Sequence, residues 1–255
     1  MDWGMECWER KDELYAPKRK VNNRGSKQHP HIIVGFYSEK MDRSIEYESL
    51  AERLYYYFLE LDHEVKRYYV QPVEVPIPVG DKKSEDKFWM HVPDVLVFRQ
   101  GSIPLLYQVK SEENSDDLRL QVKNHYCELY ADRNNWKYHV IYPKTLPPTL
   151  QRNIRFLKGF LKERYYYDKW RQITIHRLSI LGNTTIQSLS ESLKDHTDPL
   201  LIKPLIFHLI AHGFINLDVQ REINSRSEIH LNNHMINTLS EGGVSSVFQS
   251  NTTLF

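Results

Sequence analysis

The sequence predicts an α/β protein in which a mixed β-sheet flanked by helices precedes a smaller domain. Two apolar runs, Val92–Phe98 and Ile103–Lys110, enclose a glycine-containing turn, as in a β-hairpin. The segment 116–133 then has helical spacing, and 136–142 returns as a strand. A strand, a helix and a strand in this order form a right-handed parallel crossover, so the sheet should contain both antiparallel and parallel pairs.

Several segments precede the hairpin. Residues 1–30 are irregular in pattern and then basic, and His31–Tyr37 is a short candidate strand. Ser44–Leu61 has helical spacing, with the N-cap expected at its first residue. Val65–Pro78 alternates like a strand, and its prolines place it at a sheet edge. Residues 80–87 form a polar connection to the hairpin.

The helix at 116–133 follows the hairpin. Its buried stripe is expected to contain Leu118, Val122, Tyr126 and Leu129. With the strand at 136–142, the element order of the first half becomes αβββαβ. Pro143–Pro148 ends this unit, and Thr149–Tyr165 leads out of it as a helix.

The second half has a different pattern. Thr185–Leu193 is a short amphipathic helix, and Pro199–His212 is a very apolar helix whose regular part should begin at Pro204. Phe214–Leu217 and Glu228–Leu231 can pair as a two-stranded ribbon. Two helices joined by a turn and followed by a ribbon are typical of a winged-helix domain.

These elements divide the chain into four parts. They are a basic N-terminal arm (1–30), an α/β domain (31–167), a winged-helix-like domain (168–232) and a disordered tail (233–255). The apolar helix of the third part has one firm charge, Lys203. Its surplus apolar surface therefore suits a protein partner better than a DNA groove, which would need Arg, Lys, Asn or Gln.

The composition is that of an ordinary globular protein. Of the 255 residues, 40% are apolar and 26% are charged, and the net charge is +1. Two distant cysteines, Cys7 and Cys127, favour a reducing compartment and argue against a zinc site or a disulfide framework. No apolar run approaches the ~20 residues of a membrane span, and no signal peptide is recognisable. We therefore expect a cytoplasmic protein without a membrane partner.

Polar residues within the hairpin indicate a reactive site. Asp94 interrupts a run of Val, Leu and Phe, where burying an unpaired carboxylate is costly. Gln108 and Lys110 are two residues apart on the second strand, so both point to one face. An acid opposite an amide and an amine is the pattern of the PD-(D/E)xK nucleases, with Gln108 in place of the usual acid. This core would then be restriction-endonuclease-like.

Phosphodiester hydrolysis explains why these residue types would occur together. Magnesium held by carboxylates activates water and neutralises charge at phosphorus. Asp94 would be the bridging ligand, with the side-chain oxygen of Gln108 and the backbone carbonyl of Val109 as further ligands. Lys110 would orient the attacking water or stabilise the pentavalent phosphorus.

A second acid must come from outside the hairpin. The helix before the sheet offers Glu52, with Glu48 one turn behind it. Each residue also has an ordinary structural interpretation. An Asp within a strand, a Lys at a strand end and two glutamates on a half-exposed helix all occur in proteins without an active site.

The basic run at 17–27 precedes this candidate core and contains no acid. Charge runs are usually solvated faces, but an arm beside a nuclease is suited to contact DNA phosphates. The candidate DNA-binding residues are Lys18, Arg19, Lys20, Arg24 and Lys27.

Five short motifs resemble, in order, the TnsA family of transposon endonucleases. They are Gly35–Lys40, Tyr47–Glu52, Val70-Gln71-Pro72, Pro93-Asp94 and Gln108-Val109-Lys110. In this family the first catalytic acid is the Glu of a Ser-x-x-Glu pattern. The resemblance therefore implies that Glu52, after Ser49, is catalytic together with Asp94, Gln108 and Lys110.

The resemblance also implies a setting for the reaction. The enzyme would use Mg²⁺, for which Mn²⁺ substitutes, to nick the 5′ ends of transposon-end DNA in the bacterial cytoplasm. A TnsB-like DDE transposase would cut the 3′ ends, and a TnsC-like AAA+ ATPase would bind the C-terminal domain. Two alternatives stay open: a stand-alone restriction or repair nuclease of the same fold, and a non-catalytic DNA-binding or assembly module.

Overall fold

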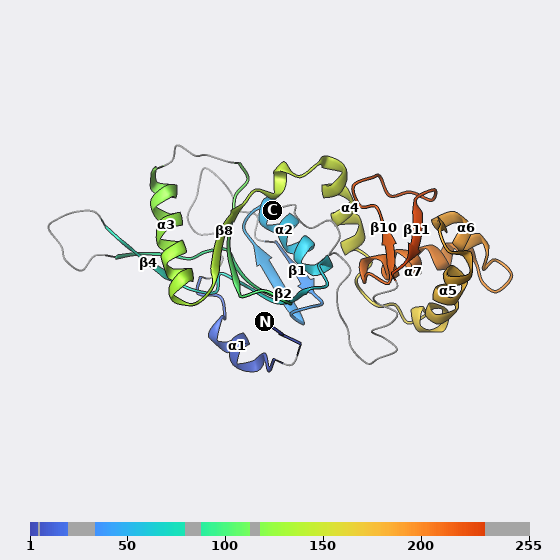
Figure 1. Cartoon of the computed structure of the whole chain (residues 1–255), viewed down its shortest axis with the longest axis horizontal. Helices are drawn as coiled ribbons and strands as arrows, with labels where there is room; N and C mark the ends of the chain where they lie inside the picture. Colours follow the sequence, from blue (N-terminus) through green and yellow to red (C-terminus); the bar gives the residue numbers. More distant parts are fainter. Residues whose placement is uncertain (5, 20–33, 80–87, 113–117, 233–255) are drawn as a thin grey trace. The chain divides into compact units, whose positions relative to one another are not determined.

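The computed structural model describes residues 1–4, 6–19, 34–79, 88–112 and 118–232 (Figure 1). The predicted polar connection at 80–87 and the predicted disordered tail lie outside these residues. No helix within the described ranges is long and apolar enough to cross a membrane.

The chain divides into two compact units. One contains residues 1–56 and 65–145, and the other contains 57–64 and 146–255. Helix α2 (Leu50–Leu61) therefore contributes its first part to one unit and its last part to the other.

A four-stranded mixed sheet is the centre of the first unit (Figure 1). Its order is β3 (Val65–Val70), β6 (Val95–Arg99), β7 (Leu105–Val109) and β8 (Lys137–Ile141). The first three strands are antiparallel, and β8 runs parallel to β7 after the crossover helix α3 (Leu118–Arg133). The hairpin and the mixed sheet flanked by helices are confirmed, and α2, β3, β6, β7, α3 and β8 follow the order αβββαβ.

Helix α2 covers one face of this sheet through aromatic contacts. The ring of Tyr55 meets that of Tyr107 in β7 at 5.3 Å, and Tyr56 stacks on Tyr68 in β3 at 6.1 Å. Tyr55, Tyr56 and Tyr68 are fully buried. Burying large aromatic side chains supplies much of the apolar area of a core, so α2 is anchored where it faces the sheet.

The N-terminal segment covers the opposite face. Trp3 and Trp8 both pack edge-on against Phe98 of β6, with ring centroids 5.0 and 5.5 Å away, and Tyr15 lies 5.9 Å from the same ring. Between Trp8 and Tyr15 runs helix α1 (Glu9–Leu14). The sequence suggested irregular structure here, but three aromatic side chains attach this segment to the core.

Helix α3 packs on β8, on the face that carries Phe98. The Tyr138 hydroxyl donates a 2.9 Å hydrogen bond to Asn124 of α3. The buried residues of α3 are Leu120, Cys127 and Ala131. The predicted stripe was wrong, because Leu118, Val122 and Leu129 are exposed. The helix mixes polar and apolar residues all round, so its sequence has no dominant apolar stripe.

Two antiparallel ribbons accompany the sheet. β1 (Val34–Ser38) pairs with β2 (Arg43–Tyr47), and β4 (Val75–Pro78) pairs with β5 (Phe88–His91). The β4–β5 ribbon lies beside α3 (Figure 1), where the Lys123 ammonium is 5.0 Å from the Trp89 ring. The sequence predicted neither β2 nor β5. A short 3₁₀ helix, Pro143–Thr145, ends the unit.

Several of the predicted elements have different boundaries. The helix expected over Thr149–Tyr165 ends at Lys158, and the first hairpin strand begins at Val95, just after Asp94. The helix expected from Ser44 begins only at Leu50, because the residues before it pair as β2 and Ser49 supplies the cap. The strand expected over 65–78 is divided in two, since Gln71 has a φ of +49° and cannot continue an extended strand.

The second unit combines helices with a three-stranded sheet. The helices are α4 (Pro148–Lys158), α5 (Tyr167–Leu181), α6 (Ile186–Glu191) and α7 (Pro199–Ala211). The strand order is β10 (Ile215–Leu217), β11 (Glu228–Leu231) and β9 (Thr184–Thr185). The β10–β11 ribbon and helices α4, α6 and α7 were expected, whereas α5 and β9 were not.

Helix α7 is the centre of this unit. It begins at Pro199 rather than Pro204, because Asp198 caps it by accepting the Leu200 N–H at 2.8 Å. Most of its apolar side chains are buried: Ile202, Leu205, Ile206, Leu209 and Ile210. Leu200 and Leu201, in its first turn, stay 69% and 45% exposed.

Asn153 of α4 provides a test of this packing. Its buried amide nitrogen donates to the carbonyl oxygens of Val219 (2.8 Å) and Arg221 (2.6 Å). Replacing Asn153 with Ala should lower the free energy of unfolding by about 1–3 kcal/mol, because two carbonyls lose their donor. Urea denaturation measures this loss. Replacing the neighbouring Arg152 with Ala, whose ion pair with Glu222 is exposed, should cost less than ~1 kcal/mol; equal losses would contradict the assignment.

Candidate active site

Asp94 lies where three elements of the first unit meet. Its N–H donates to the carbonyl of Tyr107 in β7 (3.1 Å), and its carbonyl accepts the N–H of Gln71, just after β3 (2.8 Å). The hydroxyl of Tyr56, from α2, lies 3.5 Å from the same carbonyl. The backbone of Asp94 is therefore held between β3, β7 and α2.

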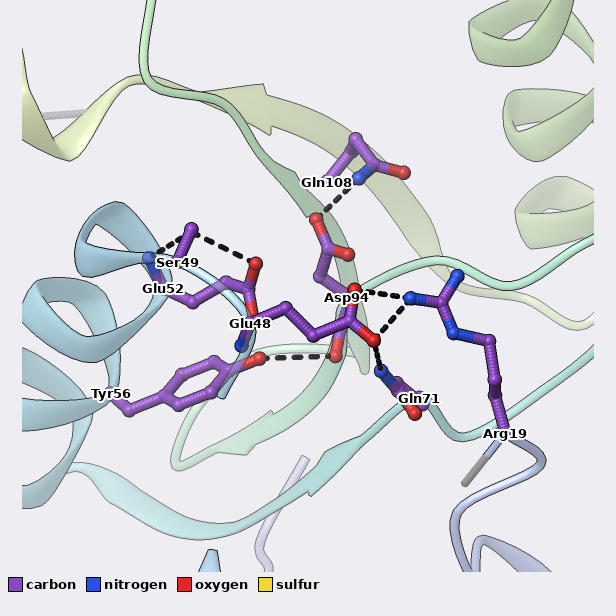
Figure 2. Close-up of polar contacts among 8 residues, drawn as sticks. All are labelled: Arg19, Glu48, Ser49, Glu52, Tyr56, Gln71, Asp94 and Gln108. Atoms are coloured by element: carbon purple, nitrogen blue, oxygen red, sulfur yellow. Dashed lines mark hydrogen bonds and ion pairs between the residues drawn. The ribbon is translucent and has the colours of Figure 1, made fainter. Parts of the chain in front are cut away.

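The carboxylate of Asp94 is bound through one of its two oxygens (Figure 2). Its Oδ2 accepts the Val109 N–H at 2.6 Å and also accepts a hydrogen bond from Nε2 of Gln108. The register pairs Val95 with Tyr107, which brings Gln108 opposite Asp94. Within the described residues Oδ1 receives no hydrogen bond, so this oxygen is available to a ligand.

The electrostatics of Asp94 indicate uncompensated negative charge. Burial is the largest effect and the neighbouring Glu52 carboxylate the next, and together they raise the pKa of Asp94 to about 7. The Val109 N–H and the Lys110 ammonium lower that pKa, but less strongly. Asp94 and Glu52 are therefore close enough to repel each other, as two carboxylates around a cation site would.

Glu52 has a structural role in addition to its charge. The Glu52 N–H donates to Oγ of Ser49 at 3.1 Å, and the Ser49 hydroxyl donates back to Oε1 of Glu52 at 2.9 Å. Oε2 accepts the Glu48 N–H at 2.9 Å. This reciprocal bonding is a variant of the capping box that begins a helix. Burial raises the pKa of Glu52, and these hydrogen bonds oppose that shift.

Glu48 is bound to the N-terminal arm instead of to Asp94. It forms an ion pair with Arg19, and its Oε1 accepts Nε2 of Gln71 at 3.3 Å (Figure 2). The N–H of Lys18 donates to the Gln71 carbonyl at 2.9 Å. Lys18 and Arg19 therefore lie beside the site. The other candidate DNA-binding residues, Lys20, Arg24 and Lys27, lie outside the described residues.

Gln108 is buried, and both ends of its amide are engaged. Nε2 faces Asp94, and Oε1 lies 2.9 Å from Nε2 of His91. In this orientation the amide presents its nitrogen to Asp94, so Gln108 could give an oxygen to an ion there only after the amide rotates. Burial lowers the pKa of His91, which favours a neutral imidazole.

The structure thus places Gln108 in contact with Asp94, and Glu52 and Lys110 act electrostatically on the Asp94 carboxylate. Lys110 follows β7, its N–H donates to the Ile141 carbonyl at 2.9 Å, and its ammonium acts electrostatically on Asp94. Val109 contributes its N–H to Asp94; its predicted role as a carbonyl ligand stays a prediction. Sequence reasoning missed His91 and Tyr56 as neighbours of these residues.

The sequence contains only weak indications that His91 and Tyr56 lie near Asp94. His91 stands three residues before Asp94, but the ribbon that orients it was not predicted. Tyr56 belongs to a run of three tyrosines, Tyr55–Tyr57, and nothing in that run indicates which hydroxyl approaches Asp94. Neither contact is visible without the tertiary arrangement, because each joins segments at least 17 residues apart.

The donor set of this site consists of oxygen atoms, the ligand type that Mg²⁺ prefers. No group of three or more His, Cys, Asp or Glu side chains within the described ranges is placed to hold a metal. The site offers two repelling carboxylates, one with an unbonded oxygen. Mg²⁺ takes oxygen ligands, keeps several waters and often binds through one or two carboxylates.

Part of the chain is similar to a nuclease family. Residues 62–142 match the family "TnsA-like endonuclease N terminal". The match contains Asp94, Gln108, Val109 and Lys110 but neither Glu52 nor the helical second unit. The match covers less than half of the chain.

A curated protein is also similar to part of the chain. It is the "ADP-ribosylation factor GTPase-activating protein effector protein 2" of Saccharomyces cerevisiae (strain ATCC 204508 / S288c). The two are 29% identical over 132 residues, which make up 50% of this chain and 40% of the yeast protein. The aligned part is thus less than half of that relative.

The raised pKa of Asp94 predicts a pH-dependent stability. The folded state keeps a proton on Asp94 up to about pH 7, whereas the unfolded chain loses it near pH 4. In EDTA, the free energy of unfolding should therefore fall as pH rises from 4 to 8, by at most on the order of 4 kcal/mol. Asp94→Asn should be more stable than the wild type at pH 8 and flatten this dependence.

Urea denaturation at a series of pH values measures both effects. Glu46→Gln, an exposed position on β2, is the matched control and should follow the wild-type curve. An Asp94→Asn curve parallel to that of the wild type would show that Asp94 is not the titrating group.

Proposed function

We propose that this chain is a metal-dependent DNA endonuclease of a cut-and-paste transposition complex. It would nick the 5′ ends of the transposon while a TnsB-like DDE transposase cuts the 3′ ends. The match of residues 62–142 to the TnsA-like endonuclease family supports the nuclease class. The five motifs that resemble TnsA proteins support the role in transposition.

One observation carries the proposal. Asp94 accepts a hydrogen bond from Gln108 and interacts electrostatically with Glu52 and Lys110. Glu52 comes from helix α2, whereas Gln108 and Lys110 come from the hairpin that also contains Asp94. A solvated acid or a strand-end lysine would not require this convergence. Convergent polar groups with a perturbed pKa are the physical signature of a functional site.

The residues suggest how the reaction would proceed. A bound Mg²⁺ would supply Lewis acidity and lower the pKa of a water that attacks phosphorus. Asp94, through Oδ1, and Glu52 would hold that ion. Val109 N–H and Gln108 keep Oδ2 of Asp94 fixed, so the other oxygen is oriented. The Lys110 ammonium would orient the water or neutralise charge at phosphorus.

The remaining parts would bind partners. The order α5, β9, α6, α7, β10, β11 supports a winged-helix-like domain in the second unit. Exposed Leu200 and Leu201 at the start of α7 support a protein partner, for which we propose a TnsC-like AAA+ ATPase. Lys18 and Arg19, beside the site, are suited to contact transposon-end DNA phosphates.

Cleavage by active-site variants tests the proposal. In a complex assembled with the transposase, the ATPase and transposon-end DNA, Asp94→Asn and Lys110→Met should lower the rate of 5′ nicking by about 100-fold or more. Binding of DNA and partners should persist. Asp132→Asn and Lys137→Met, at exposed positions of the same unit, are the matched controls.

The other outcomes separate the alternatives. Normal nicking by both active-site variants would disprove the site. Cleavage of plasmid DNA by the purified chain with Mg²⁺ and no partner would favour a stand-alone nuclease. Partner and DNA binding by a wild-type chain that never cuts in the assembled complex would favour a non-catalytic module.

The cap at Ser49 allows the two roles of Glu52 to be separated. Glu52→Gln keeps an oxygen for the Glu48 N–H and can complete a capping box, so helix α2 should stay folded. It removes the charge, and we expect 5′ nicking to fall by about 100-fold or more. Glu48→Gln should reduce nicking by less than ~10-fold. Equal activity losses, with circular dichroism unchanged, would contradict Glu52 as the first acid.

A further inference from the structure

His91 contacts the candidate active site without belonging to the residues assigned to it. It ends β5, where it pairs with Val75 of β4, and lies three residues before Asp94. Its Nε2 is 2.9 Å from Oε1 of Gln108, while Nε2 of Gln108 donates to Asp94. These two contacts connect the imidazole to the carboxylate through one amide.

An amide at this position creates a problem that a carboxylate would not. A carboxylate presents equivalent oxygens, whereas one end of the Gln108 amide donates hydrogen bonds and the other accepts them. Half a rotation exchanges the two ends and replaces attraction to Asp94 with repulsion between oxygens. Asp94 favours the nitrogen end, and a His91 ring that donates from Nε2 to Oε1 favours the same orientation from the far end of the amide.

The surroundings of His91 hold its ring in place. The Trp89 ring lies on the same strand, with its centroid 5.7 Å from that of His91, and the Lys123 ammonium lies 5.0 Å from the Trp89 ring. His91 is partly buried, and Gln108 is 5% exposed, so water competes little for their hydrogen bond. A ring fixed by its neighbours can orient the amide, as second-shell partners orient metal ligands.

We propose that His91 is a positioning residue of the cation site, acting through Gln108 on Asp94. By engaging Oε1 of Gln108 it directs the amide nitrogen to Oδ2 of Asp94, and this leaves Oδ1 free for the ion. His91 touches neither the ion nor DNA. This inference rests on the proposed function, because it needs a cation at Asp94.

Titration of the full-length chain with Mn²⁺ alone, by calorimetry, tests the proposal apart from activity. His91→Phe keeps a planar ring but removes the nitrogen, and it should weaken Mn²⁺ binding by about 10-fold or more. His91→Gln can still donate to Oε1 of Gln108 and should restore binding to within about 3-fold of the wild type. His139→Phe, a ring on β8 next to Tyr107, is the matched control and should bind like the wild type.

A double-mutant cycle separates positioning from general structure. If His91 acts through Gln108, His91→Phe should cause no further loss of Mn²⁺ affinity in a Gln108→Ala background. Additive losses, or failure of His91→Gln to restore binding, would overturn the proposal. If His91→Phe binds Mn²⁺ as tightly as the wild type, the positioning role of His91 is overturned and the proposed function is not affected. A wild-type chain that binds no Mn²⁺ would overturn the cation site and the proposed function with it.

Discussion

The candidate active site is arranged around a single buried carboxylate. Asp94 lies just before β6, and removing its charge from water costs free energy unless hydrogen bonds and cations compensate. The Val109 N–H, the Gln108 amide and the Lys110 ammonium provide part of that compensation, and Glu52 opposes it. The strands and α2 therefore support an arrangement that is electrostatically unfavourable by itself. Such uncompensated charge is stable only within a rigid scaffold and is characteristic of a functional site.

The sequence predicts an element correctly where the local pattern of apolar residues matches the way that the element packs in the fold. The apolar runs on either side of Gly101 gave the hairpin, and its register gave the pairing of Asp94 with Gln108. The crossover to β8 followed from handedness and length. The helix before the sheet offered Glu52 and Glu48 as candidates for a second acid, and the family resemblance assigned the catalytic role to Glu52.

The features that the sequence did not predict depend on interactions between residues far apart in the chain. A local sequence pattern gives no information about such interactions. Ser44 and Ser49 are equally good caps by type, and only the pairing of β2 with β1 excludes Ser44. The N-terminal residues looked irregular because their order comes from packing Trp3 and Trp8 on Phe98. The stripe of α3 was misassigned because a helix between a sheet and solvent need not bury its largest side chains. Gln71 breaks its strand through a positive φ that no residue type required.

Glu52 shows why the structural and the catalytic interpretations of a residue need not compete. Its hydrogen bonds to Ser49 and to the Glu48 N–H begin α2, and the same bonds fix the carboxylate near Asp94. A free glutamate would turn toward water and away from a like charge, because repulsion between carboxylates favours separation. The cap prevents that movement. The hydrogen bonds that stabilise the end of the helix therefore also keep the Glu52 carboxylate near Asp94, where both charges can attract a cation. Placing an acid in a capping box is therefore a physical means of holding two carboxylates together before any ion binds.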